Sequence, residues 1–295
     1  MRRFRKVLNL SAKEGRIIGK LYVVGTPIGN LNDWSPRAEK TLREVDFIAA
    51  EDTRVTLKLL NKFDIHTPLL SYHDHNRASR GPEILARLQQ GESCALVTDA
   101  GMPAISDPGE ELVRLCRENG VEVESVPGPV AFATALAVSG MPAGRFTFEG
   151  FLSVNKQSRN KHLQSLQNET RTMLFYEAPH KLVATLRDLY AALGDRDVAL
   201  CRELTKLHEQ VIRTTLSQAA TLYETQKPLG EFVLIVAGKP EQAQQHFTLS
   251  EAVDLVLQLT QGGMALSAAA KEVSAQTGFQ KGALYKQAVQ RQSEN

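Results

Sequence analysis

Residues 20–29, KLYVVGTPIG, place a short apolar run directly before a turn rich in glycine and proline. The same order returns at 94–109 (CALVTDAGMPAISDPG) and at 121–129 (VEVESVPGP). Glycine lets a ligand approach the backbone, and proline fixes the path of the chain. Ligands of open α/β sheets bind at the carboxyl ends of the strands. These turns therefore indicate a pocket for a polar ligand with a flat apolar part, although any one of them alone would be typical of a structural turn.

Around these turns, short apolar runs alternate with segments of helical period from residue 19 to residue 238, which is the pattern of an α/β protein. In the first half the sequence predicts strands at 20–24, 47–50, 69–72, 94–98 and 121–126, and helices at 36–45, 53–63, 82–90 and 109–119. In the second half it predicts strands at 146–151, 172–176, 198–202, 209–214 and 232–237, and helices at 181–193 and 217–225.

The punctuation Gly140-Met141-Pro142 predicts a domain boundary, with one α/β domain at 19–141 and a second at 142–240. The polar stretch 241–246 has the composition of a linker. Residues 247–295 then show three short helical patterns with a tight turn at Thr277-Gly278, typical of a small helix-turn-helix-like module. The alternative is a helical cap that only packs on the main body.

Composition limits the class of protein. With 295 residues, 42% hydrophobic and 23% charged, the chain has the size of two domains plus an appendage and the composition of an ordinary globular protein. No apolar run approaches the 18 to 20 residues, roughly, that a membrane span needs. Three cysteines without a CxxC spacing predict neither a disulfide framework nor a zinc ribbon, and we expect a cytoplasmic protein whose cysteines are buried and reduced.

The net charge of +2 does not by itself predict a nucleic-acid partner, but the basic residues are unevenly distributed. Residues 1–18 form a basic tail, which is either a solvated arm without a task or an arm attracted to a phosphate backbone. The stretch 156–162 carries Lys156, Arg159 and Lys161 without an acid. It is either an RNA-binding segment or a solvated loop.

Three further polar motifs leave alternatives open. Asp52 or Thr53 follows a predicted strand and could simply cap the next helix. His73 and His75 are two residues apart and would share a face if they lay on a strand, but no third metal ligand lies near them in the sequence. The segment 203–209 brings acids, Lys206 and His208 together, either as a surface ion-pair cluster or as a substrate site.

Seven motifs occur in one order: TPIGNL (26–31), AEDTR (50–54), HDHN (73–76), DAGMP with SDPG (99–109), PGP (127–129), FYEAPH (175–180) and RELTK (202–206). Together they resemble the ribosomal RNA small subunit methyltransferase I family, a branch of the two-domain tetrapyrrole methylase fold of class III methyltransferases. The resemblance covers about residues 19–238, and the terminal helices are similar to that family's small C-terminal domain. The first 18 residues lie outside the pattern, and Thr98 stands where serine is more usual.

The resemblance implies that S-adenosylmethionine binds between the two α/β domains and that a homodimer methylates the ribose 2′-hydroxyl of a cytidine in the decoding centre of 16S rRNA. The implied cofactor residues are Thr26, Pro27, Gly101, Met102, Pro103, Ile105, Val130, Ala131, Tyr176, Ala178, Leu204 and Glu231. Catalytic candidates are Asp99, Glu177, Lys206 and Asp52, because a ribose hydroxyl needs a group that takes or orients its proton. RNA-binding candidates are Arg54, His75, Asn76, Lys156, Arg159 and Lys161. No metal is implied.

Two other functions stay open. A small-molecule methylase on the same fold would act on a tetrapyrrole-like acceptor, but such an acceptor needs neither the basic stretch nor the C-terminal helices. A non-catalytic RNA-binding protein would use the helical module and would not bind S-adenosylmethionine.

Overall fold

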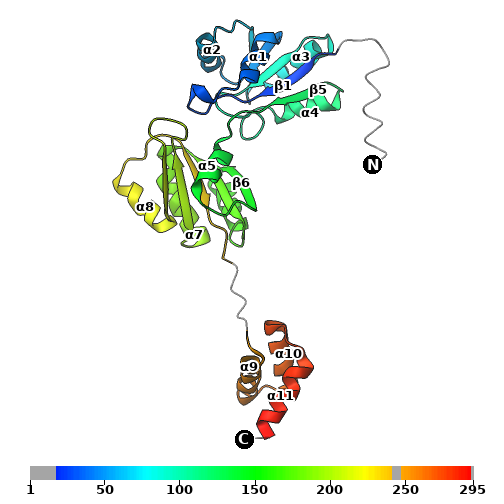
Figure 1. Ribbon diagram of the computed structural model, residues 1–295, viewed down its shortest axis with the longest axis vertical. Helices are drawn as coiled ribbons and strands as arrows, with labels where there is room; N and C mark the ends of the chain where they lie inside the picture. The colour runs from blue at the N-terminus through cyan, green and yellow to red at the C-terminus, as the bar shows by residue number, and fades with distance from the viewer. Residues whose placement is uncertain (1–17, 241–246, 294–295) are drawn as a thin grey trace. The chain divides into compact units, whose positions relative to one another are not determined.

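The computed structural model describes residues 18–240 and 247–293, so the basic tail and the expected linker lie outside the described residues, the tail except for its last residue. The chain divides into two compact units between Gly238 and Lys239 (Figure 1). The first unit contains both sheets, and the second contains the C-terminal helices. No helix among the described residues is long and apolar enough to cross a membrane.

The first sheet is parallel and has the strand order β3-β2-β4-β1-β5. Its strands are β1 (Lys20–Val24), β2 (Phe47–Ala50), β3 (Leu69–Ser71), β4 (Cys94–Val97) and β5 (Glu122–Val126). Four helices pack on its two faces, α1 (Pro36–Glu44) and α2 (Thr53–Lys62) with one core cluster, α3 (Arg77–Gln89) and α4 (Glu110–Glu118) with another. A short 3-10 turn, η2 (Leu31–Asp33), follows β1. Because both faces are covered, β2 and β4 are buried at every residue.

The second sheet is mixed and has the order β6-β7-β10-β8-β9. Its strands are β6 (Phe146–Phe151), β7 (Thr172–Glu177), β8 (Asp197–Arg202), β9 (Gln210–Thr215) and β10 (Phe232–Val236). β6 pairs with β7 in parallel, and every other pair is antiparallel. On one face lie α6 (Lys156–Ser165), α7 (Leu182–Leu193) and α8 (Leu216–Thr225), and on the other lies α5 (Ala131–Ser139). The 3-10 turn η3 (Pro179–Lys181) leads from β7 into α7.

The strands expected from the sequence are confirmed to within a residue, but the expectations for three helices, α3, α5 and α6, are wrong. α3 begins at Arg77, with Pro82 inside the helix; the proline is exposed, so the carbonyl that it fails to bond can face water. α5 and α6 were not expected as helices, and α6 replaces the loop considered for 156–162. The strand β3 ends at Ser71, so His73 and His75 lie in a turn and share no strand face.

The expected boundary near residue 141 falls between α5 and β6. α5 packs its Ala135 and Leu136 on the second sheet, although it precedes that boundary in the chain. The three cysteines are buried and free, as expected.

The C-terminal unit is three helices around one small core: α9 (Leu249–Gln261), α10 (Leu266–Thr277) and α11 (Lys281–Ser293). Thr248 and Glu251 form a capping box at the start of α9, and Gly278 ends α10 in the left-handed conformation. These are the three helices that the sequence predicts. Tyr285 and Val289 on α11 are 42% and 40% exposed, so they contribute less to the core than their spacing suggests.

Candidate functional site

The turns after β1, β4 and β5 meet at the carboxyl edge of the first sheet. Thr26 and Gly101 form an isolated antiparallel bridge, in which each N–H donates to the other residue's carbonyl at 2.9 and 3.1 Å. The Thr26 hydroxyl also donates to the Thr98 carbonyl at 3.1 Å. Gly25 and Gly128 touch through their backbones, since a Cβ on Gly25 would lie 2.6 Å from the Gly128 Cα. Side chains at these two glycines would push the turns apart.

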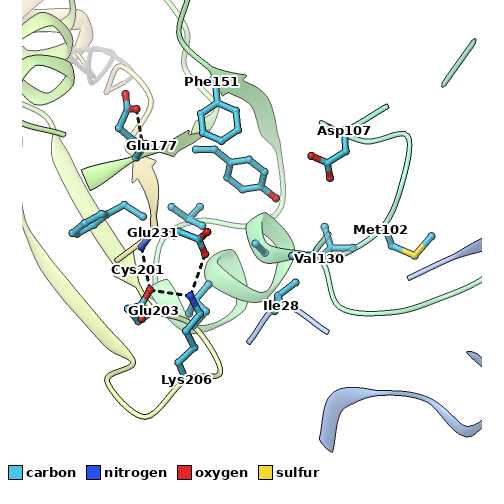
Figure 2. A pocket seen from close by; sticks show the side chains of 18 residues that line it. Ile28, Met102, Asp107, Val130, Phe151, Glu177, Cys201, Glu203, Lys206 and Glu231 are labelled. Carbon is cyan, nitrogen blue, oxygen red and sulfur yellow. Dashed lines mark hydrogen bonds and ion pairs between the residues drawn. The ribbon is translucent and has the colours of Figure 1, made fainter. Parts of the chain in front are cut away.

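A cavity of about 270 Å³ opens between these turns and the second sheet (Figure 2). The first sheet and its loops contribute one wall, and the ends of β6, β7, β8 and β10 contribute the other. Most of the lining is apolar. The lining residues are Ile28, Ala100, Gly101, Met102, Asp107, Val130, Ala131, Phe151, Tyr176, Glu177, Ala178, Cys201, Glu203, Leu204, Lys206, Glu231, Phe232 and Val233.

Lys206 is held at this cavity between two carboxylates. Its ammonium group donates to Glu203 Oε1 at 3.0 Å and to Glu231 Oε2 at 3.2 Å (Figure 2). The hydrogen bond from Lys206 lowers the pKa of Glu203. Burial works against the charge of Lys206, but the hydrogen bonds to both carboxylates outweigh it and raise the pKa of the lysine. Lys206 is therefore a fixed cation at neutral pH and a poor proton acceptor.

Three carboxyl groups, those of Glu51, Asp99 and Asp107, lie in the loops that follow β2 and β4 of the first sheet. Burial raises the pKa of Asp107, Asp99 and Glu51, and the negative charges of neighbouring carboxylates raise it further. Asp107 lies on the cavity wall. Asp99 directly follows Thr98 at the end of β4, and its Oδ1 accepts a hydrogen bond from the Asp52 N–H at 3.2 Å. These carboxylates would be stabilised by a ligand that brings positive charge.

Comparison with known proteins identifies the family. The model of the tetrapyrrole (corrin/porphyrin) methylases matches residues 20–220. A ribosomal RNA small subunit methyltransferase I from Synechocystis is 49% identical over 269 residues, which are 91% of this chain and 96% of the relative. This chain belongs to the ribosomal RNA small subunit methyltransferase I family. The Escherichia coli O157:H7 protein of that name is 44% identical over 93% of this chain and 96% of its own.

Solved structures of more distant methylases share the fold. Uroporphyrin-III C-methyltransferase from Thermus thermophilus, complexed with S-adenyl homocysteine, is 17% identical with a TM-score of 0.53 over 74% of this chain and 97% of that chain. Diphthine synthase is 14% identical with a TM-score of 0.56 over 74% and 89% of the two chains. The family and the fold expected from the sequence motifs are thus confirmed.

The structure brings ten of the sequence-predicted site residues of this family member into the cavity wall: Gly101, Met102, Val130, Ala131, Tyr176, Glu177, Ala178, Leu204, Lys206 and Glu231. Thr26 and Pro103 are buried beside it, and Ile105 is 52% exposed on the loop. Pro27 and Asp99 line a neighbouring hollow. Their contact with a cofactor stays a prediction.

Two of the four catalytic candidates have carboxylates that are already engaged. Glu177 is 4% exposed; its Oε1 accepts from the Ala178 N–H at 2.9 Å, and its Oε2 accepts from the Thr185 hydroxyl on α7. Asp52 caps α2, and hydrogen bonds from Arg54 lower its pKa to about 2. Such contacts argue against either group as a proton acceptor and leave Asp99, whose carboxylate accepts only the Asp52 N–H, as the freest of the three carboxylates.

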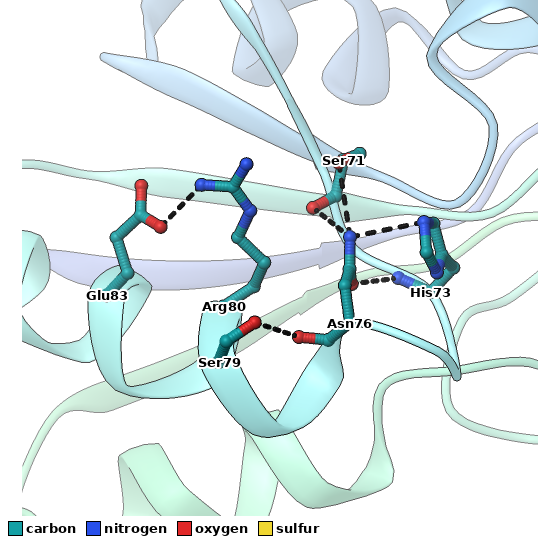
Figure 3. A network of polar contacts seen from close by, with 6 residues as sticks. All are labelled: Ser71, His73, Asn76, Ser79, Arg80 and Glu83. Atoms are coloured by element: carbon teal, nitrogen blue, oxygen red, sulfur yellow. Dashed lines mark hydrogen bonds and ion pairs between the residues drawn. The ribbon is translucent and has the colours of Figure 1, made fainter.

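The RNA-binding candidates divide in the same way. Arg159 is 12% exposed and donates to Asp188 Oδ2 at 2.6 Å and to the Thr185 hydroxyl at 2.9 Å, so it holds α6 on α7. The Asn76 side chain accepts from the His73 N–H at 2.9 Å and donates to the Ser71 carbonyl at 3.1 Å (Figure 3). The side chains of Arg159 and Asn76 are therefore engaged in contacts that stabilise the fold.

The remaining RNA-binding candidates, Lys156, Lys161, Arg54 and His75, are exposed, and Arg54 pairs with Asp52.

Sequence reasoning missed several lining residues. Glu203 and Asp107 stand inside the quoted motifs at 202–206 and 99–109. An acid directly after a predicted strand could have pointed to Glu203, and an acid in a glycine- and proline-rich loop could have pointed to Asp107. Phe151 had no such signal, because it looks like the ordinary last residue of an apolar strand.

Proposed function

We propose that this chain transfers a methyl group from S-adenosylmethionine to the ribose 2′-hydroxyl of a cytidine in the 16S RNA of the small ribosomal subunit. Membership of the ribosomal RNA small subunit methyltransferase I family supports the substrate. The observation that carries the reaction is the cavity at the carboxyl edge of the first sheet, closed by three glycine and proline turns. No described group of three or more metal-ligating side chains accompanies it.

The lining of the cavity fits this cofactor. Apolar side chains such as Val130, Leu204 and Phe232 suit the adenosyl part, and the Asp107 carboxylate suits its positive charge. Gly101 lines the cavity without a side chain of its own, so a ligand can approach the backbone at this position. S-adenosylmethionine supplies a methyl group already activated on a sulfonium sulfur. The protein then has mainly to align the acceptor, exclude water and handle one proton.

We assign Asp99 as the group that accepts the proton of the ribose 2′-hydroxyl. A ribose hydroxyl is a weak nucleophile, and a positioned proton acceptor contributes about 10²- to 10⁴-fold. Burial raises the pKa of Asp99, which improves a carboxylate as an acceptor. Lys206, held as a cation by Glu203 and Glu231, supplies fixed positive charge at the cavity wall.

The RNA is proposed to meet Lys156 and Lys161 on α6, together with Arg54 and His75, all of which are exposed. The C-terminal unit adds the basic residues Lys271, Lys281 and Lys286. Arg291 is less available than its sequence suggests, because it pairs with Asp254 and donates to the Ser250 hydroxyl at 2.7 Å. By family analogy we also propose a homodimer that acts in the cytoplasm, where small subunits are assembled.

Mass spectrometry of the RNA after incubation with unmodified small subunits and labelled S-adenosylmethionine tests this function. We expect one methylated cytidine, with the label on its ribose. Asp99→Asn should lower kcat about 10²- to 10⁴-fold and leave the Kd of S-adenosylmethionine unchanged. Asp197→Asn, at the exposed start of β8, is the matched control and should behave as wild type.

Two results would redirect the proposal. Methylation of a tetrapyrrole in place of subunits would favour the small-molecule methylase. Absence of S-adenosylmethionine binding in calorimetry would favour a non-catalytic RNA-binding protein.

A further inference from the structure

An extra residue in β6 turns the end of that strand toward the cavity. Phe148 is opposite Leu174 of β7 and Gly150 is opposite Phe175, so two steps along β6 correspond to one step along β7. Gly150 has a φ of +62°, which suits glycine at such a bulge. In a regular strand, residues three apart face opposite sides of the sheet. Here Phe148 and Phe151 instead lie 5.0 and 5.5 Å, centroid to centroid, from the same ring, that of Tyr176.

The result is an aromatic side chain that lines the cavity and remains 59% exposed. Phe151 meets the Tyr176 ring edge to face, with 61° between the ring planes. Figure 2 shows the Phe151 side chain among those that line the cavity. Tyr176 is itself fixed, because its hydroxyl accepts a hydrogen bond from the Phe132 N–H at 3.1 Å. The phenyl ring is therefore supported from behind by a positioned neighbour, while much of it stays open to a ligand.

The position of Phe151 favours the acceptor over the cofactor. Leu204, Phe232 and Cys201 are buried in the interior of the cavity, whereas Phe151 lies where the side chains become exposed. Val154, three residues further on, is 82% exposed, and α6 with Lys156 and Lys161 follows directly. An exposed aromatic ring followed along the chain by exposed lysines is consistent with a single-stranded nucleic acid held through base stacking and phosphate contacts.

We propose that Phe151 is the stacking platform for a nucleobase of the RNA substrate, the base of the methylated nucleotide or its neighbour. Proteins read RNA mainly where bases are unstacked and can lie on aromatic side chains. Stacking of one base would hold its ribose at the cavity mouth, so Phe151 acts as a positioning residue. This inference rests on the proposed RNA methylation.

The test compares Phe151→Ala with Phe151→Tyr and with Phe146→Ala. Phe146 is the matched control, a 41% exposed phenylalanine of the same strand that does not line the cavity. For each variant we would measure the Kd of S-adenosylmethionine by calorimetry, the KM and kcat on unmodified small subunits, and the Tm. Phe151→Leu, which keeps an apolar side chain without a π face, replaces Phe151→Ala if the alanine variant does not fold.

We expect Phe151→Ala to lower kcat/KM about 5- to 150-fold, mainly through KM, because this is the usual loss when one base loses its aromatic partner. The Kd of S-adenosylmethionine should stay within about twofold of wild type, and Phe151→Tyr should restore KM. A comparable rise in the cofactor Kd would overturn the inference in favour of an adenine contact, and an unchanged kcat/KM would overturn it outright. Failure of the proposed function is distinguishable, because wild type itself would then not methylate subunits.

Discussion

Replacing Gly101 by valine should abolish tight S-adenosylmethionine binding and leave the chain folded. Gly101 has a φ of +88°, where a side chain is strained, and a Cβ there would already be 3.4 Å from Ile28 Cγ2 and from the Pro129 carbonyl. The two γ-methyl groups must then enter the cavity of about 270 Å³ or displace its loop. The conformational strain itself is about 1–3 kcal/mol, which is less than the stability of a typical domain.

Gly120→Val is the matched control, because Gly120 has a φ of +74° and nothing within 4 Å of an added Cβ. Both variants should lose stability, with Tm lowered by about 2–4 °C for each kcal/mol of strain in a unit of this size. Only Gly101→Val should raise the Kd of S-adenosylmethionine. The expected rise is about tenfold or more, which corresponds to a loss of at least about 1.4 kcal/mol of binding free energy. Calorimetry on both variants and thermal unfolding provide the measurements. Wild-type affinity in a folded Gly101→Val protein would refute the position of the cofactor site.

Four further outcomes are expected. EDTA should leave S-adenosylmethionine binding unchanged in calorimetry; loss that a divalent ion restores would contradict this. The double variant Lys156→Ala/Lys161→Ala should bind RNA with a weaker salt dependence: the magnitude of the slope of log K for RNA binding against log salt concentration should fall by about 1.4 to 1.8. Arg159→Ala should instead chiefly lower Tm. Deletion of residues 247–295 should raise KM for subunits without changing the cofactor Kd; an insoluble product would argue against independent units. Asp52→Asn should be less stable than wild type at neutral pH, and urea titrations should show the difference disappearing as pH falls from about 4 to about 2, because the pKa of Asp52 is lowered to about 2 in the folded chain.

Strand positions could be predicted because apolar runs with β-branched residues end at glycine or proline, as β1 does at Gly25 and β5 at Pro127. Helices that lack distinct polar and apolar faces could not be predicted in this way. α5 is almost entirely apolar and α6 is almost entirely polar, so neither shows a clear helical period. Pro82 was taken for the first residue of a helix, the position where proline is most common, and thus concealed the first turn of α3.

The site could be predicted where its residues directly follow strands, as with Gly101 and Lys206. The contacts between residues far apart in the chain could not be predicted from the sequence. Arg159 is withdrawn from solvent by Thr185 and Asp188, which lie 26 and 29 residues further along the chain. Phe151 reaches the cavity through a shift in the register of β6 against β7, which no pattern within β6 reveals.

The position of β10 has a consequence for the order in which the nascent chain can fold. The first sheet is complete once β5 ends at Val126, so its strands can pair while the rest of the chain is still being synthesised. The second sheet lacks its middle until the end, because β10, its last strand in sequence, lies between β7 and β8. Until Val236 has left the ribosome, both of those strands present unpaired edges, which are prone to aggregation. A stop codon between β8 and β10 would therefore leave a complete first sheet attached to a second sheet whose β7 and β8 edges stay unpaired. Such an incomplete chain carries a risk of aggregation in addition to the loss of its cavity.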